Sequence, residues 1–221
     1  MQTIRLGAKG EAVRCLERAL RLTPGGVFDD LLEREVKNYQ ATNGLTADGI
    51  VGPRTWAALS GLDILPGEPM RSTAERGGRD IRYVVVHHSD TTTRAGMVRA
   101  LNAAGREAST HYSVDVDGSI HCHADPLEFV TWHCPGANLH GIGVDVIHRR
   151  GMPFPEAQIA ATGALLRWLC LVHGLPAVAA EGRFPVGKGQ LARQAWGVVG
   201  HGQVQVTRCP DGFPIAEALR G

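Results

Sequence analysis

Residues 81–89 read Ile-Arg-Tyr-Val-Val-Val-His-His-Ser and decide the fold of the larger part of this chain. The aromatic and β-branched run at residues 83–86 predicts a buried strand. That strand ends in two imidazoles, His87 and His88. Because successive side chains of a strand point to opposite faces, only one of these two histidines can face a given site.

A second stretch, residues 196–210, has a similar order of features. An apolar run at residues 196–199 is followed by His201, and Cys209 stands eight positions further on. Imidazole nitrogen and thiolate sulfur are good zinc ligands, and three protein ligands leave a fourth position for water. We therefore hypothesise that His87, His201 and Cys209 hold one catalytic zinc ion. This spacing is no recognised compact zinc motif, so the residues alone equally allow a buried strand-end histidine and a buried cysteine.

The composition narrows the class of protein. The chain has 221 residues, of which 43% are hydrophobic and 20% charged, which is typical of a soluble globular protein of one or two domains. A net charge of +1 argues against a nucleic-acid partner, which usually meets a basic face. No apolar run reaches the ~18 residues of a membrane span, and the first residues do not resemble a secretory signal. We expect a monomer that is made in the cytoplasm and has no membrane partner.

The five cysteines are scattered, and an odd number is a poor disulfide framework. Cys122 and Cys134 are the one pair that could form a disulfide. Synthesis in a reducing cytosol makes free thiols the expectation for both.

The first part of the chain has the periodicity of helices. Apolar residues recur with helical spacing at residues 10–20 and 29–39, and Pro53 begins a third, short helix. We interpret residues 1–62 as a small three-helix domain. Residues 63–79 are rich in turn-forming residues and lack periodicity, which indicates a linker.

Residues 80–221 are predicted to form an α/β domain with a mixed central sheet flanked by helices. We expect strands at residues 81–87, 110–116, 119–123 and 142–147, helices at 95–104 and 155–173, and a long surface loop at 176–191 that could form one wall of a substrate groove.

The three-helix domain resembles a known family. Residues 6–13 (LGAKGEAV) and, above all, residues 43–56 (NGLTADGIVGPRTW) are similar to the peptidoglycan-binding domain of the PG_binding_1 type. The resemblance implies binding to the bacterial cell wall. We select Asp48 and Tyr39 as candidate substrate-binding residues, although each could equally serve only to build the turn or the core.

The second domain resembles the amidase-2 family, which includes phage amidases and peptidoglycan recognition proteins. Four matches stand in the order of the family: residues 85–89, His111-Tyr112 leading to Asp117-Gly118, Trp132-His133 followed by residues 142–144, and His201 with Cys209-Pro210. The resemblance implies a zinc ion held by His87, His201 and Cys209, with His87 selected over His88. It also implies cleavage of the amide between N-acetylmuramic acid and L-alanine.

The resemblance also suggests the remaining catalytic groups. Where some branches carry a tyrosine this chain has Thr110, and where others carry a glutamate it has Asp145. We therefore expect Asp145 to activate the water, with the alternative that it only orients a zinc histidine. Thr207 takes the position of the family's oxyanion partner. His133 and Trp132 are candidate substrate contacts.

Taken together, these expectations describe a two-domain zinc amidase that acts on the glycan strands and stem peptides of peptidoglycan. A wall-binding domain without an export signal resembles the endolysins with which phages lyse their hosts. Two alternatives are a non-catalytic peptidoglycan-recognition module and a bacterial wall-remodelling or effector amidase. His121 and His123 share one strand face and could form a metal pair, but we interpret them as surface or groove residues; His140 and His148 receive no role.

Overall fold

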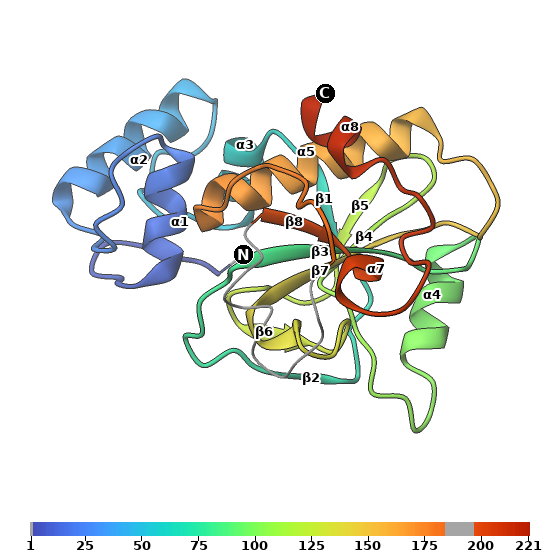
Figure 1. Cartoon of the computed structure of the whole chain (residues 1–221). Coiled ribbons are helices and arrows are strands. Elements are labelled where there is room, and N and C mark those ends of the chain that lie inside the picture. The colour runs from blue at the N-terminus through green and yellow to red at the C-terminus, as the bar shows by residue number, and fades with distance from the viewer. Residues whose placement is uncertain (1, 184–196) are drawn as a thin grey trace.

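The computed structural model describes residues 2–183 and 197–221 (Figure 1). Three helices come first, as expected: α1 (Glu11–Ala19), α2 (Asp30–Thr42) and α3 (Pro53–Ser60). The Asp29 carboxylate caps α2 by accepting the backbone N–H of Leu32 at 2.9 Å, and Pro53 opens α3 at the position where a missing N–H costs nothing.

The larger part of the chain is built on a six-stranded mixed sheet, which confirms the predicted fold class. Only β4 and β5 pair antiparallel; the other neighbouring strands run parallel. In spatial order the strands are β1 (Ile64–Pro66), β5 (Ile120–Cys122), β4 (Tyr112–Val114), β7 (Gly141–Val146), β3 (Tyr83–His88) and β8 (Gly197–Gly200).

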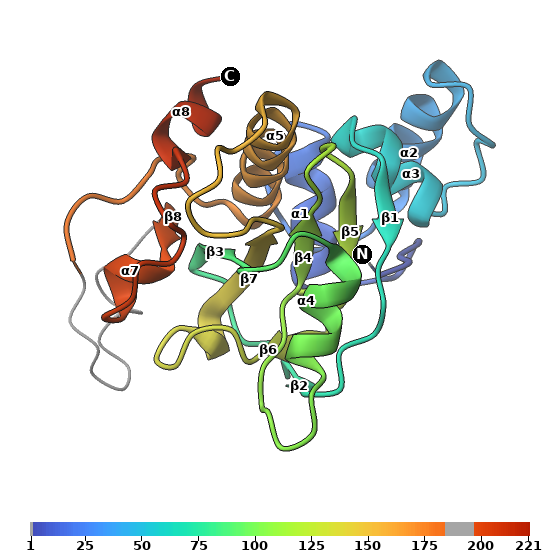
Figure 2. The same ribbon diagram turned by 90° about the vertical axis from the view of Figure 1, so that its right-hand side faces the viewer.

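The two faces of the sheet have different covers. Val84 and Val86 of β3 pack into a core with the long helix α5 (Glu156–His173). Tyr83 and Val85 point the other way, into a smaller core under the loop that follows β6 (Phe129–Thr131). Figures 1 and 2 both show α5 above the sheet and β6 below it. The shorter helices are α4 (Arg94–Leu101), η1 (Asn138–His140), α7 (His201–Val204) and α8 (Ile215–Arg220).

The segment 63–79, expected to be a linker without regular structure, contains two strands. β1 pairs with β5 at the edge of the main sheet, and β2 (Thr73–Glu75) pairs with β6. The expectation was wrong on this point because these three-residue strands show no alternation and lie among turn-forming residues, without the hairpin turn that marked β4 and β5. Arg76 also fixes the segment, since its buried guanidinium donates hydrogen bonds to the carbonyls of Pro126, Leu139 and Gly141.

The N-terminal helices share a core with the sheet domain. Trp168 and Val172 of α5 belong to the same apolar cluster as Val13 and Leu16 of α1. Arg18 adds a hydrogen bond of 2.8 Å from its Nη1 to the carbonyl of Val172. The helical region therefore packs directly on the C-terminal half of α5, as Figure 1 shows.

The remaining findings concern membrane-spanning helices, the cysteines and the loop expected after α5. Among residues 2–183 and 197–221, no helix combines the length and the apolar character needed to cross a membrane. All five cysteines are free thiols, including Cys122 and Cys134. Of the loop expected at residues 176–191, residues 184–191 lie outside the described part of the chain.

Candidate metal centre and catalytic cavity

The alternation of β3 brings His87 to the face of the sheet opposite α5. His87 follows Tyr83 and Val85 on that face, whereas His88 follows Val84 and Val86 toward the other side. β8 runs parallel to β3, so its C-terminal end lies at the same edge and delivers His201 at the start of α7. The carboxyl ends of parallel strands are the usual place for a site in open α/β sheets.

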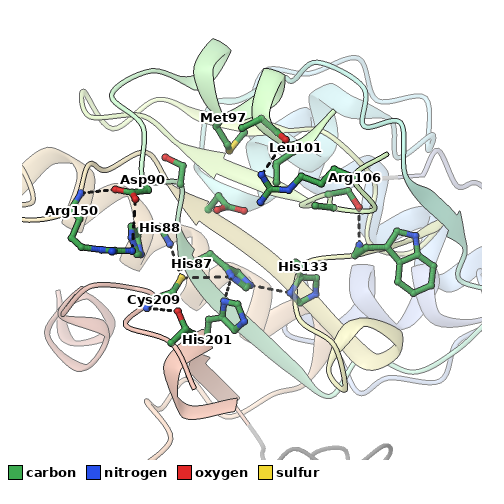
Figure 3. A pocket seen from close by; sticks show the side chains of 17 residues that line it. His87, His88, Asp90, Met97, Leu101, Arg106, His133, Arg150, His201 and Cys209 are labelled. Carbon is green, nitrogen blue, oxygen red and sulfur yellow. Dashed lines mark hydrogen bonds and ion pairs between the residues drawn. The ribbon is translucent and has the colours of Figure 1, made fainter. Parts of the chain in front are cut away.

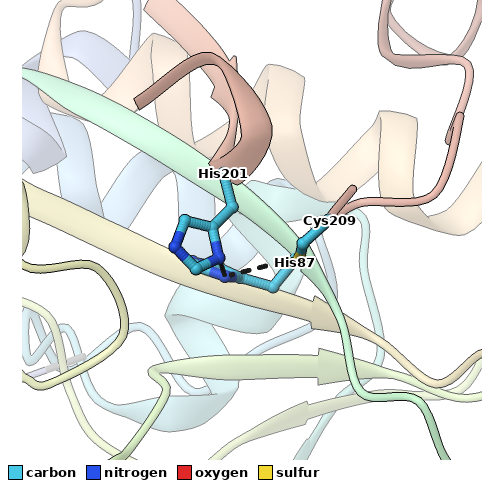
Figure 4. Close-up of side chains that lie close together, drawn as sticks. All are labelled: His87, His201 and Cys209. Atoms are coloured by element: carbon cyan, nitrogen blue, oxygen red, sulfur yellow. Dashed lines mark hydrogen bonds between the residues drawn. The ribbon is translucent and has the colours of Figure 1, made fainter. Parts of the chain in front are cut away.

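Three candidate ligand atoms converge at this edge (Figure 4). Nδ1 of His87 lies 3.1 Å from Nδ1 of His201 and 3.9 Å from Sγ of Cys209. All three atoms lie within 4.8 Å of one another. Nitrogen and sulfur ligands of a tetrahedral zinc lie about 3.3 to 3.6 Å apart, so the spacing and the donor set fit zinc.

The protonation states of the three groups also suit a cation. Burial lowers the pKa of His87 far below its ordinary value, helped by the nearby His133 and His201, and burial lowers the pKa of His201 as well. Both imidazoles are therefore neutral and free to act as donors. Burial raises the pKa of the Cys209 thiol to about 12. Without a cation the sulfur keeps its proton, so metal binding at this site would release one.

Asp145 stands beside His87 in the sheet. The two residues are register partners in the parallel pair β3–β7, which puts their side chains on the same face. Asp145 is 7% exposed, and burial raises its pKa to about 6 against the opposing effects of the Thr110 hydroxyl and the Arg106 guanidinium. A carboxylate with a pKa this close to neutrality is suited to accept a proton.

These groups open into one cavity of about 290 Å³ (Figure 3). The three candidate ligands and Asp145 line it together with Trp132, His133 and Thr207, which the sequence also selected. Thr207 is half-buried, and its Oγ1 accepts the backbone N–H of Cys209 at 3.2 Å. Its own hydroxyl hydrogen remains available to an oxygen in the cavity.

Other histidines do not join the centre. The ring of His88 is buried beside that of His148, 6.1 Å away, and neither of its nitrogens has a polar partner among the described residues. His121 and His123, expected at the surface or in the groove, are buried instead. The expectation was wrong because β5 is covered by Glu68 and Arg94, which bond to His123 and His121.

The structure does not bring the two N-terminal candidates into this cavity. Oδ1 of Asp48 accepts hydrogen bonds from Nε2 of Gln40 at 3.1 Å and from the backbone N–H of Ile50 at 2.8 Å, so it builds the turn. Asp48 also lines a separate hollow beside α3. Tyr39 is partly buried on α2 and does not line that hollow.

Two residues of the site were missed in the sequence. Arg106 lines the cavity, and its guanidinium acts to lower the pKa of Asp145. Gln205 contacts His201. The spacing of four between His201 and Gln205 is a signal that could have found the latter, since such residues meet on one helix face. No local pattern marks Arg106, because its place depends on the path of the loop after α4.

Comparisons with known proteins assign both parts of the chain to known families of domain. The family model of N-acetylmuramoyl-L-alanine amidase matches residues 77–212, and that of a peptidoglycan binding domain matches residues 10–59. No curated protein sequence matches the chain.

Several solved structures are similar to this one. The N-acetylmuramoyl-L-alanine amidase LysC from Clostridium intestinale superimposes with a TM-score of 0.50 and 18% identity, over 71% of this chain and 95% of its own. The Drosophila peptidoglycan recognition protein SA gives 0.48 and 18%, over 76% and 87%. The endolysin of the Thermus scotoductus bacteriophage Ph2119 gives 0.45 and 16%, over 64% and 86%. Because the amidase model covers more than half of this chain and includes all three candidate ligands, the protein belongs to the N-acetylmuramoyl-L-alanine amidase family.

Proposed function

We propose that this protein is a zinc-dependent hydrolase of the amide bond between N-acetylmuramic acid and L-alanine in peptidoglycan. The observation that carries the proposal is the convergence of His87, His201 and Cys209 in one cavity with the buried carboxylate of Asp145. When bound, zinc supplies a Lewis acid that lowers the pKa of water and polarises an amide carbonyl.

Four residues of the cavity then have defined tasks. Asp145 takes the proton of the attacking water and returns it to the leaving amine, for which a pKa of about 6 is suitable. The Thr207 hydroxyl donates a hydrogen bond to the oxygen on which negative charge develops. Trp132 and His133 form part of the wall against which the sugar and the stem peptide lie.

The N-terminal helical region is proposed to hold the polymer. The match to a peptidoglycan binding domain at residues 10–59 supports this role, and the shared core with α5 fixes that domain on the amidase. Asp48 and Tyr39 remain our candidates for contact with the wall. Co-sedimentation of folded Asp48→Ala and Tyr39→Ala variants with purified sacculi tests them. A variant that is folded but binds sacculi less tightly has lost a contact with the wall. A variant that is folded and binds normally shows that the residue has only a structural role.

An endolysin-like role, in which the enzyme lyses a host wall after the inner membrane is breached, joins both activities. The combination of a match to a peptidoglycan binding domain with a match to an amidase family supports it. The clearing of sacculus suspensions by protein loaded with one zinc ion, and its loss with a chelator, tests the activity. A protein that binds sacculi and zinc but releases no peptide would instead be a recognition module.

A comparison of substrates tests the polymer preference. Rates on intact sacculi and on soluble muropeptides separate an enzyme of the wall from one that recycles fragments. We expect sacculi to be preferred, and the preference to fall when wall binding by the helical region is lost.

A further inference from the structure

We propose that His133 and Gln205 are positioning residues, which hold the two histidine ligands with their Nδ1 atoms turned toward the metal. The loop from Trp132 to His140 contains His133 and, through the carbonyl of Pro135, also accepts a hydrogen bond from Gln205. This inference rests on the proposed zinc chemistry and assigns to His133 a task besides contact with substrate.

The contact of His133 with His87 is the first observation. Nε2 of His87 lies 3.1 Å from Nδ1 of His133, on the side of the ring away from His201 and Cys209 (Figure 3). Nδ1 of His87 faces the other two ligands, so its lone pair is needed there and the ring hydrogen must sit on Nε2. His133 thus accepts this hydrogen through Nδ1 and fixes the tautomer of His87.

The contact of Gln205 with His201 repeats this arrangement. Nε2 of His201 lies 2.7 Å from Oε1 of Gln205, while Nδ1 faces His87. The Gln205 amide is oriented by a second bond, from its Nε2 to the carbonyl of Pro135 at 3.3 Å. Pro135 is two residues from His133, so one loop reaches both ligand histidines. The third ligand needs no such side chain, because the backbone N–H of His88 already contacts Sγ of Cys209 at 3.2 Å.

The surroundings of His133 are shaped to bring it this close. Oδ1 of Asn138 accepts the backbone N–H groups of His133 and Cys134, at 3.0 and 2.7 Å, and holds the turn. A Cβ at Gly143 would stand 2.7 Å from Cγ of His133, and one at Gly141 would stand 3.2 Å from its Cε1. The ring therefore requires glycine at position 143, and a side chain at position 141 would crowd it.

His133 also carries an uncompensated cost. Its Nε2 is buried and has no hydrogen-bond partner among the described residues. Once Nδ1 accepts from His87, this Nε2 bears the hydrogen, and residues 2–183 and 197–221 offer it no acceptor. An apolar side chain could fill the same space without burying an unpaired N–H group. The histidine is therefore best explained by its contact with His87.

The experiment measures zinc affinity by competition with a chromophoric chelator, without substrate. His133→Ala and Gln205→Met remove the two acceptors, whereas His133→Asn and Gln205→Glu keep an oxygen near the same place. His140→Ala is the matched control, because His140 lies on the same loop but its ring bonds to Asp80 and does not line the cavity. The thermal midpoint of each metal-free variant shows whether it folds.

We expect His133→Ala and Gln205→Met each to weaken zinc binding about 10- to 100-fold, the range usual for such partners of metal ligands. The zinc affinity of His133→Asn and Gln205→Glu should stay within a few fold of wild type, and that of His140→Ala should be unchanged. The d–d absorption of the cobalt-substituted protein should shift only in His133→Ala and Gln205→Met. Unchanged zinc affinity in folded His133→Ala and Gln205→Met would overturn the inference and leave the amidase proposal standing. A wild-type protein that binds no zinc would overturn both.

Discussion

Asp145 and His87 are register partners across the parallel pair β3–β7, so a buried carboxyl group and a candidate metal ligand stand side by side on the face of the sheet away from α5. This relationship connects the stability of the protein with its chemistry. Burial raises the pKa of Asp145 to about 6, which means that the folded protein resists the charged form that the proposed reaction needs.

The first prediction concerns the stability of metal-free protein. Because the folded pKa of Asp145 lies about two units above its ordinary value, the folded state binds more protons than the unfolded state between about pH 4 and pH 6, and stability falls as the pH rises through this window. Asp145→Asn removes the charge, so its free energy of unfolding at pH 7.5 should exceed that of wild type by up to about 3 kcal/mol. Urea denaturation at pH 7.5 and pH 3.5 measures this, and the gain should vanish at the lower pH. A variant less stable than wild type at pH 7.5 would contradict the buried-charge assignment.

The second prediction separates the two roles considered for Asp145. If it is the base, Asp145→Asn should lower turnover on sacculi by at least about 100-fold while zinc affinity stays within a few fold of wild type. If it only orients a histidine ligand, zinc affinity should fall together with turnover. Parallel measurement of both quantities decides, and we expect the first pattern.

The third prediction concerns Thr207. Thr207→Val keeps the shape of the side chain but removes the hydroxyl, and turnover should fall about 100-fold, as for the loss of one oxyanion donor. Thr207→Ser should keep most of the activity. The hydroxyl also accepts the backbone N–H of Cys209, so the zinc content of each variant must be measured beside its rate. Full activity of a zinc-loaded Thr207→Val variant would exclude the hydroxyl from the reaction.

The fourth prediction follows from the core shared by α1 and α5. Since Trp168 and Val172 pack among residues of the helical region, the full chain should unfold in a single cooperative transition. Trp168→Ala should lower the free energy of unfolding by about 3 to 5 kcal/mol. Calorimetry of the metal-free protein tests this, with equality of the calorimetric and van't Hoff enthalpies as the criterion. Two separate transitions would show that the helical region folds as an independent, tethered unit.

Much of the fold could be predicted because long helices and strands show a recognisable pattern of apolar residues. The run of valines before His87 predicted β3, and α5 was expected at nearly its observed bounds. β1 and β2 could not be predicted, since three residues show no alternation and their pairing partners lie more than fifty positions away. The segment expected to be a linker therefore contributes β1 to the main sheet and β2 to a separate two-stranded sheet.

The candidate site likewise has residues that the sequence could predict and contacts that only the folded chain shows. His87, His201 and Cys209 were candidates from their residue types, but only the fold brings their ligand atoms together. The contact of His133 with His87 depends on glycines at 141 and 143 that leave space for a ring from a different loop. No pattern local to residue 133 contains that information, because close approach between distant segments is a property of the packed structure.

The most direct test of the central claim is mass spectrometry of purified peptidoglycan after digestion with zinc-loaded protein. We expect free stem peptides that begin with an unmodified L-alanine amino group, together with glycan strands bearing the intact lactyl carboxylate of N-acetylmuramic acid. Both products should disappear when a chelator removes the metal or when Cys209→Ala replaces the wild type. Fragments in which every stem peptide is still joined to its sugar, or release of the same peptides by metal-free protein, would contradict the assignment of a zinc amidase.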